Sequence, residues 1–241
     1  MKTIILGPPG TGKTTTLLNL VDDFMKAGVD SKRIGYFSFT KKAAHEASTR
    51  AAEKFNLDQE HDLVNFRTLH SLAFRVLRTS KERVMKPEDY REFGLKVGIP
   101  IKMAYYSDND GVFNCDNEYL RLINRSRVTE RDLMDVYDDN LHGLDIERDT
   151  LFLLDQEFTR FKKEKGMVDY DDMLADFTTQ DISPSFDVLF IDEAQDLSPL
   201  QWRMVRGMWA KSDKTYIAGD DDQAIFKWAG ADVDHFIALR D

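Results

Sequence analysis

A glycine-rich stretch near the start of the chain has the residue types and spacing of a phosphate-binding loop. "GPPGTGKT", residues 7–14, fits G-x-x-x-x-G-K-[ST] in full and lies between a strand-like run and a helix-like segment. Backbone N–H groups there can surround a phosphate, Lys13 can neutralise the β and γ oxygens, and the Thr14 hydroxyl can hold Mg²⁺. A glycine-rich turn without a ligand is the plainer alternative, but spacing and context favour a nucleotide site. The residues expected to bind the nucleotide are Gly7, Pro8, Pro9, Gly10, Thr11, Gly12, Lys13, Thr14 and Thr15.

A second acidic motif, "DVLFIDEAQD", ends an apolar run with Asp192 and Glu193. The carboxyl ends of parallel strands meet at one edge of a sheet, so Asp192 is expected to reach the Mg²⁺ shell. Glu193 is then placed to orient and deprotonate an attacking water. Alone, this pair is more typical of a solvated helix start, where carboxylates are favoured. Beside a phosphate loop it indicates a hydrolase.

The third motif is "GDDDQAIFKWAG", residues 219–230, which follows another apolar run. Gln223 is a candidate for detecting and stabilising the γ-phosphate, since an amide can donate to a phosphate oxygen. Asp220, Asp221 and Asp222 are expected to cap the turn by accepting backbone N–H groups. A calcium loop is the sharper alternative, but the spacing is not that of an EF-hand.

The order of apolar and amphipathic segments predicts an α/β fold. Strand-like runs cover residues 3–6, 34–39, 187–191 and 215–218, and helical patterns cover 13–27, 41–55, 69–78 and 199–210. Apolar strands that alternate with amphipathic helices predict a parallel sheet with helices on both faces.

Residues 80–144 differ from this pattern, with many charges, turn-forming residues, and helical periodicity at 118–124 and 130–138. They predict a mostly helical insertion, from which the chain returns through a helix near 150–165. The expected division is therefore residues 1–79 for the first part of the sheet domain, 80–148 for the inserted subdomain and 149–241 for the second part.

The composition is that of an ordinary globular protein, with a net charge of −10 over 241 residues. Any binding to nucleic acid must then come from a local basic or aromatic track. One cysteine, Cys115, fits a reducing compartment, and the scattered histidines indicate no zinc site. The apolar run at the start is too short for a signal peptide or a membrane span, so a cytoplasmic protein without a membrane partner is expected.

Together, "GPPGTGKTT", "LFIDEAQDLS" and "YIAGDDDQAIFKWAGA" resemble the UvrD/Rep/PcrA branch of superfamily 1 DNA helicases. "FSFTKKAAHEASTRA", "RTLHSLAFRVLR" and "GMVDYDDML" resemble further segments of that family. The resemblance covers nearly the whole chain, although the insertion matches only in position and character. It implies a RecA-like phosphate-loop NTPase domain with ATP and Mg²⁺ as cofactors. It also implies single-stranded DNA and fork DNA as partners and movement of the 3′-to-5′ type.

The resemblance further implies that Phe226 and Trp228 offer faces on which unpaired bases stack, a contact that is independent of sequence. Phe39, Thr40, Thr68 and His70 would line the same track, and Lys41, Lys42 and Lys227 could meet backbone phosphates. Each has a structural alternative. Phe39 taken alone is more typical of a core, His70 of a hydrogen-bonded helix start, and Trp228 is undecided.

The chain departs from the family pattern in two ways. It begins six residues before Gly7, without the upstream segment whose glutamine reads adenine, and Thr15 stands where an arginine is common, so adenine preference stays open. The sequence stops at Asp241, shortly after the aromatic turn, whereas the resemblance implies that a helicase of this type needs a second RecA-like domain. We therefore expect the N-terminal part of a larger or split enzyme, completed in cis or trans, that hydrolyses ATP poorly alone. The alternatives are an ATP-switched binding module without turnover and, less favoured, an unrelated clamp-loader-like or nucleotide-kinase NTPase.

Overall fold

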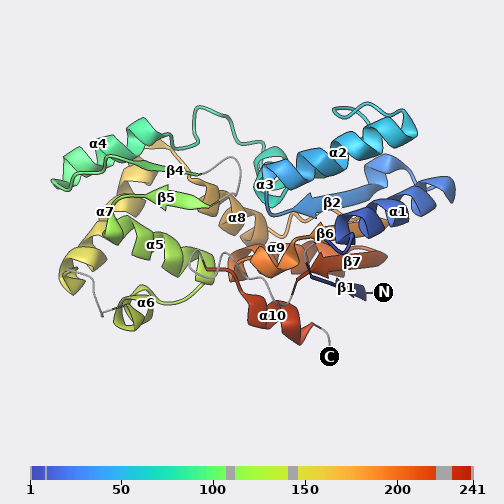
Figure 1. The fold of residues 1–241 in the computed structure, drawn as a ribbon. Coiled ribbons are helices and arrows are strands. Elements are labelled where there is room, and N and C mark those ends of the chain that lie inside the picture. Colours follow the sequence, from blue (N-terminus) through green and yellow to red (C-terminus); the bar gives the residue numbers. More distant parts are fainter. Residues whose placement is uncertain (1, 9, 107–111, 141–145, 221–229, 240–241) are drawn as a thin grey trace.

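The central element of the fold is a parallel sheet. The computed structural model describes residues 2–8, 10–106, 112–140, 146–220 and 230–239. Within these residues five strands pair in the order β1-β7-β6-β2-β3, and every neighbouring pair is parallel (Figure 1). They are β1 (Lys2–Leu6), β7 (Lys214–Gly219), β6 (Val188–Asp192), β2 (Ile34–Ser38) and β3 (Phe66–Thr68). The predicted α/β class is confirmed.

Alternation along the central strand shows how both faces of the sheet are covered. Val188 and Phe190 of β6 pack in one core with residues of α1 (Lys13–Lys26) and α2 (Lys41–Phe55). Leu189 and Ile191 face the opposite core, which includes residues of α3 (Leu69–Val76), α8 (Tyr170–Thr179), α9 (Pro199–Ala210) and α10 (Val233–Ala238). Every residue of β6 and β2 is buried, which explains their continuous apolar sequence.

The insertion has its own hydrophobic core, built from α4 (Pro87–Val97), α5 (Glu118–Thr129), α6 (Leu133–Asp139) and α7 (Arg148–Lys165). It also contains an antiparallel pair, β4 (Ala104–Tyr106) with β5 (Phe113–Cys115), which the helical patterns did not predict. The break between α5 and α6 lies at Glu130, which caps α5 in the left-handed region at φ 54°, so α6 begins later than residue 130.

The two bodies meet where two chain segments pass side by side. Val84 and Val168 form a parallel bridge and pack with the sheet core, whereas the adjacent Met85 and Met167 pack with the inserted core. Since α7 also packs in the inserted core, we propose that the insertion runs from residue 85 to residue 167 rather than from 80 to 148. Among the described residues, no helix combines the length and the apolar character needed to cross a bilayer.

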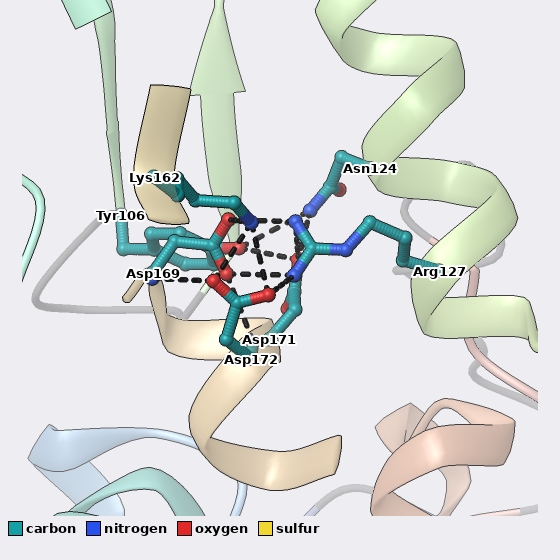
Figure 2. Close-up of polar contacts among 7 residues, drawn as sticks. All are labelled: Tyr106, Asn124, Arg127, Lys162, Asp169, Asp171 and Asp172. Carbon is teal, nitrogen blue, oxygen red and sulfur yellow. Dashed lines mark hydrogen bonds and ion pairs between the residues drawn. The ribbon is translucent and has the colours of Figure 1, made fainter. Parts of the chain in front are cut away.

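A buried cluster of charges joins the insertion to α8 (Figure 2). Asp169, the N-cap of α8, accepts two hydrogen bonds from Arg127 of α5 at 2.6 and 2.8 Å and one from Lys162 of α7 at 2.7 Å. Asp172 contacts the same arginine and lysine. Because α8 packs on the sheet core, this cluster fixes the insertion relative to the sheet.

The cluster shifts the pKa values of two neighbouring carboxyls in opposite directions. Burial opposes ionisation of Asp169, but the charges of Arg127 and Lys162 outweigh it and hold its pKa well below the usual range. Burial raises the pKa of Asp171 to about 6, although Arg127 opposes the shift. Asp171 accepts hydrogen bonds from the Tyr106 hydroxyl at 2.6 Å and the Asn124 amide at 2.5 Å. The cluster thus connects four elements of the chain.

Replacing Arg127 with alanine should lower the free energy of unfolding by roughly 3 kcal/mol, because Asp169 and Asp172 would keep only Lys162 as a cationic partner. Urea denaturation measures this loss. Arg121→Ala is the matched control, since Arg121 lies on the same helix in an exposed pair with Glu118. Arg121→Ala should lower the free energy of unfolding by less than about 1 kcal/mol. Equal losses in the two variants would contradict a stabilising role for the cluster.

Candidate active site and adjoining groove

The strand register brings the motifs to one edge of the sheet. Leu6 pairs with Gly219, and Ser38 pairs with both Asp192 and Thr68. The glycine-rich loop, the acidic motif, the third motif and the two segments after β2 and β3 therefore all start from the same edge. A parallel α/β sheet places ligand sites at this edge.

The loop of residues 7–14 leaves the start of α1 open to an anion. Gly12 caps the helix at φ 82°, a conformation that suits glycine, and no side chain caps the first turn. That turn also contains no acidic residue. A Cβ on Gly7 would lie 2.6 Å from the Thr11 hydroxyl, so the tight loop needs glycine there as well. Such a helix start offers backbone N–H groups and a positive dipole end to a phosphate.

Lys13 and Thr14 extend in different directions from this turn. The Lys13 ammonium donates to the carbonyls of Gly7 at 2.6 Å and Pro8 at 3.2 Å, which holds its charge across the loop. The Thr14 hydroxyl donates to Asp192 at 3.0 Å. Thr15 is exposed in the same turn, whereas Pro9 lies outside the described residues.

Asp192 is buried and fixed by three donors. One carboxylate oxygen accepts from Thr14 and, at 2.7 Å, from the Tyr36 hydroxyl, and the other accepts from the Glu193 N–H at 3.0 Å. Burial and the Asp192 charge raise the pKa of Tyr36 well above its ordinary value, so the phenol stays a donor. Sequence reasoning missed Tyr36, although a hydroxyl within an apolar strand was a usable signal. The oxygens of Thr14 and Asp192 are of the type that Mg²⁺ prefers.

Glu193 lies in the left-handed region at φ 54°, which is uncommon for a residue with a side chain. Its carboxylate accepts from the Gln195 amide at 2.7 Å, and the same amide donates to Asp196 at 3.2 Å. The Gln195 oxygen accepts from the Asp220 N–H at 2.9 Å, across to the end of β7. Neither Gln195 nor Asp196 was singled out on sequence.

Part of the third motif lies outside the described residues, including Asp221, Asp222, Gln223, Phe226, Lys227 and Trp228. Their expected roles in detecting phosphate and stacking bases stay predictions. Asp220 is described and lies buried directly after β7, where its N–H donates to the Gln195 side-chain oxygen.

Three of the residues that the resemblance assigned to a DNA track also have structural roles. Thr40 and Thr68 are N-caps, accepting from the N–H groups of Ala43 and Ser71. Phe39 is 6% exposed within the sheet core, so it has little surface to offer a base. Burial and, secondarily, the charge of Lys41 lower the pKa of His70 to about 4, which keeps its ring neutral.

Beside these residues runs a groove of about 500 Å³ between the sheet edge and the insertion. Thr68 and His70 contribute to one wall, and Tyr105, which is 41% exposed, contributes to another. Its described lining contains no carboxylate. The lysines and aromatic residues along it are Lys41, Lys81, Lys86, Phe74, Tyr90, Tyr105, Tyr106 and Tyr170. In a chain with net charge −10, this is a local basic and aromatic track.

Comparison with known proteins identifies a family. Residues 1–241 match the family model described as UvrD/REP helicase N-terminal domain. The chain is 23% identical to the ATP-dependent DNA helicase Rep of Buchnera aphidicola over 98% of its length, and 27% identical to a probable DNA helicase II homolog of Mycoplasma genitalium over 95%. It is 25% identical to the ATP-dependent DNA helicase PcrA of Leuconostoc citreum over 97%. The matches cover 36%, 34% and 32% of these relatives, so the chain spans about a third of their length.

The Asp196 carboxyl should make stability depend on pH. Burial first, and then the charge of Glu193, raise its pKa to about 7. The folded state therefore holds this proton to higher pH than the unfolded chain, and the contribution to stability is lost as pH rises from about 4 to about 7. Asp196→Asn, which does not titrate, should raise the melting temperature more at about pH 8 than at about pH 5.

Thermal melts at both pH values test this. Asp181→Asn is the control for loss of one charge, because its side chain is 79% exposed. An identical effect of Asp196→Asn at the two pH values would show that Asp196 does not titrate in this range.

Proposed function

Because this chain belongs to the family of UvrD/REP helicase N-terminal domains, we propose that it is the part of an ATP-dependent DNA helicase that binds ATP and contacts single-stranded DNA. The supporting observation is the hydrogen bond between Thr14 and Asp192, whose positions lie 178 residues apart in the chain. It joins the glycine-rich loop to the acidic motif at one point. The fold alone would leave the chemistry open, because phosphate-loop sheets serve many reactions.

In this proposal the loop residues 7–15 hold the phosphates of ATP. Lys13 supplies a positive charge to the β and γ oxygens, and Glu193 orients and deprotonates the attacking water. Gln223 would contact the γ-phosphate from the turn after β7. Thr14 and Asp192 would hold Mg²⁺, which when bound neutralises charge on the phosphates. Two protein oxygens suffice, since Mg²⁺ usually takes its other ligands from water and substrate phosphates.

We assign the single strand to the groove between the sheet edge and the insertion. Lys41, Lys81 and Lys86 would meet backbone phosphates, and exposed aromatic faces such as Tyr105 would stack on bases. Phe226 and Trp228 would add further stacking faces. Thr40 and Thr68 would act mainly through the backbone that they cap. His70 would act through its ring contacts with Tyr106 and Tyr170, and Phe39 through the core beneath the groove.

Translocation and unwinding of fork DNA, with 3′-to-5′ polarity, are assigned to the complete protein. Relatives of this chain are about three times longer, which leaves room for a second RecA-like domain. Such a domain would close over the nucleotide and supply arginines to the transferring phosphate, a contribution on the order of 10³–10⁵ in rate. The alternative is an ATP-switched DNA-binding module without turnover.

Steady-state ATP hydrolysis by the complete protein, with and without oligo-dT, tests the nucleotide site. Lys13→Ala and Glu193→Gln should each lower kcat by at least about 100-fold, because they remove charge stabilisation and the base. Trp228→Ala should remove most of the stimulation by DNA while the basal rate persists. ATP-dependent DNA binding without phosphate release would favour the switch and contradict the enzyme.

The salt dependence of oligo-dT binding tests the groove. Each of Lys81→Ala and Lys86→Ala should reduce the slope of log K against log salt concentration by about 0.7, the value for one contact to a single-stranded phosphate. Lys211→Ala is the control, because Lys211 follows α9, pairs with Asp181 and lies near the opposite, amino edge of the sheet. If all three variants keep the original slope, the strand binds elsewhere.

A further inference from the structure

Gln195 lies between the two strand ends that carry the acidic motif and the third motif. It belongs to a short 3₁₀ helix, Ala194–Asp196, directly after β6, and is 4% exposed. No role follows from its position in the sequence. Its contacts, however, reach both Glu193 and Asp220, the residue that follows β7.

Both the nitrogen and the oxygen of the Gln195 amide make hydrogen bonds. Its nitrogen donates to the Glu193 carboxylate at 2.7 Å and to Asp196 at 3.2 Å, and its oxygen accepts from the Asp220 N–H at 2.9 Å. A flipped amide would place its oxygen against the Glu193 carboxylate and its NH₂ group against an N–H donor. The neighbours therefore dictate one orientation, and the amide can satisfy Glu193 and Asp220 only from this position.

The backbone around Gln195 is shaped for this contact. A Cβ at Gly219 would lie 2.8 Å from the Gln195 oxygen and 2.5 Å from Phe236, so only glycine allows β7 to come this close. Glu193, on the other side, has the left-handed conformation at φ 54°. Such a conformation persists only where surrounding contacts hold it, and it is found at functional sites more often than elsewhere.

We propose that Gln195 is a positioning residue that holds the Glu193 carboxylate for hydrolysis and ties it to the turn beginning at Asp220. This inference rests on the proposed function. In that function the turn also carries Gln223 and the aromatic faces of Phe226 and Trp228. A shift of the chain at the end of β7 would move the Asp220 N–H, and Gln195 would transmit this movement to Glu193.

The role differs from that of a buried glutamine that only stabilises the fold. Gln201 is such a residue, buried nearby, where its side-chain oxygen accepts from the Ser198 N–H in the capping box of α9. Loss of Gln201 should lower stability without changing turnover. Loss of Gln195 should change turnover and its response to DNA while ATP still binds.

The experiment compares Gln195→Ala, Gln195→Glu and Gln201→Ala in the complete protein. We measure the Kd of a fluorescent ATP analogue, kcat and KM for ATP, and the ratio of kcat with oligo-dT to kcat without it. Both Gln195 variants should keep Kd and KM within about threefold and lose about 10–100-fold in kcat, as is typical when a partner that orients a catalytic group is removed. The stimulation ratio should fall with kcat. Gln201→Ala should keep the wild-type kcat and the wild-type stimulation ratio.

Wild-type kcat and stimulation in either folded Gln195 variant, beside an inactive Glu193→Gln, would overturn the inference and leave the proposed function intact. An absence of Lys13-dependent hydrolysis in the unmodified protein would instead overturn the proposed function. Gln195→Glu nearly preserves the size of the side chain, so it stays informative if Gln195→Ala does not fold. A fall in kcat with an unchanged stimulation ratio would show that Gln195 orients Glu193 but does not link it to the turn.

Discussion

In a parallel sheet every strand directs its carboxyl end to the same edge, and in this chain that edge collects the segments that carry chemistry. The pairing of Ser38 with Asp192, and of Leu6 with Gly219, sets how far each segment extends beyond the sheet. Thr14 can reach Asp192 only because this register is held by two cores, one on each face. The geometry of the site is therefore a consequence of packing far from it.

Burying carboxylates beside this edge has a free-energy cost, which the fold offsets with donors and cations. Asp192 receives hydroxyl and backbone donors, so within the described part of the chain it is fixed without an ion pair to lysine or arginine. Asp169 is instead held by Arg127 and Lys162. These different partners suit the different positions of Asp192, at the sheet edge, and Asp169, between the insertion and α8. A ligand for a cation must not already be neutralised by a protein charge, whereas a structural junction gains from such a charge.

Sequence reasoning predicted the sheet, its two-sided cover and the motifs, because spacing and periodicity are local properties. It missed β3, whose three residues, "FRT", are too few to show an alternating pattern. It missed Tyr36 and Gln195, because their importance comes from what lies opposite them in the folded chain. It assigned residues 149–165 to the sheet domain, whereas we propose that α7 belongs to the insertion, because helical periodicity shows which residues face a core but not which core. The roles of Gln223, Phe226 and Trp228 stay predictions, because these residues lie outside the described part of the chain.

The groove links the insertion to the proposed work of the sheet edge. One wall comes from the segments after β2 and β3, and another from Tyr105 and Tyr106 of the insertion. Tyr106 donates to Asp171, whose neighbour Tyr170 also lines the groove, so the network that joins the two bodies also sets the distance between the walls. The proposed ATP site uses the ends of β1, β6 and β7, and β2 lies directly beside β6. Because β2 and β6 are paired along all of their residues, a displacement of β6 would also move β2. It would therefore change both the carboxylates and the groove, which gives the shared edge a means of relating nucleotide to strand.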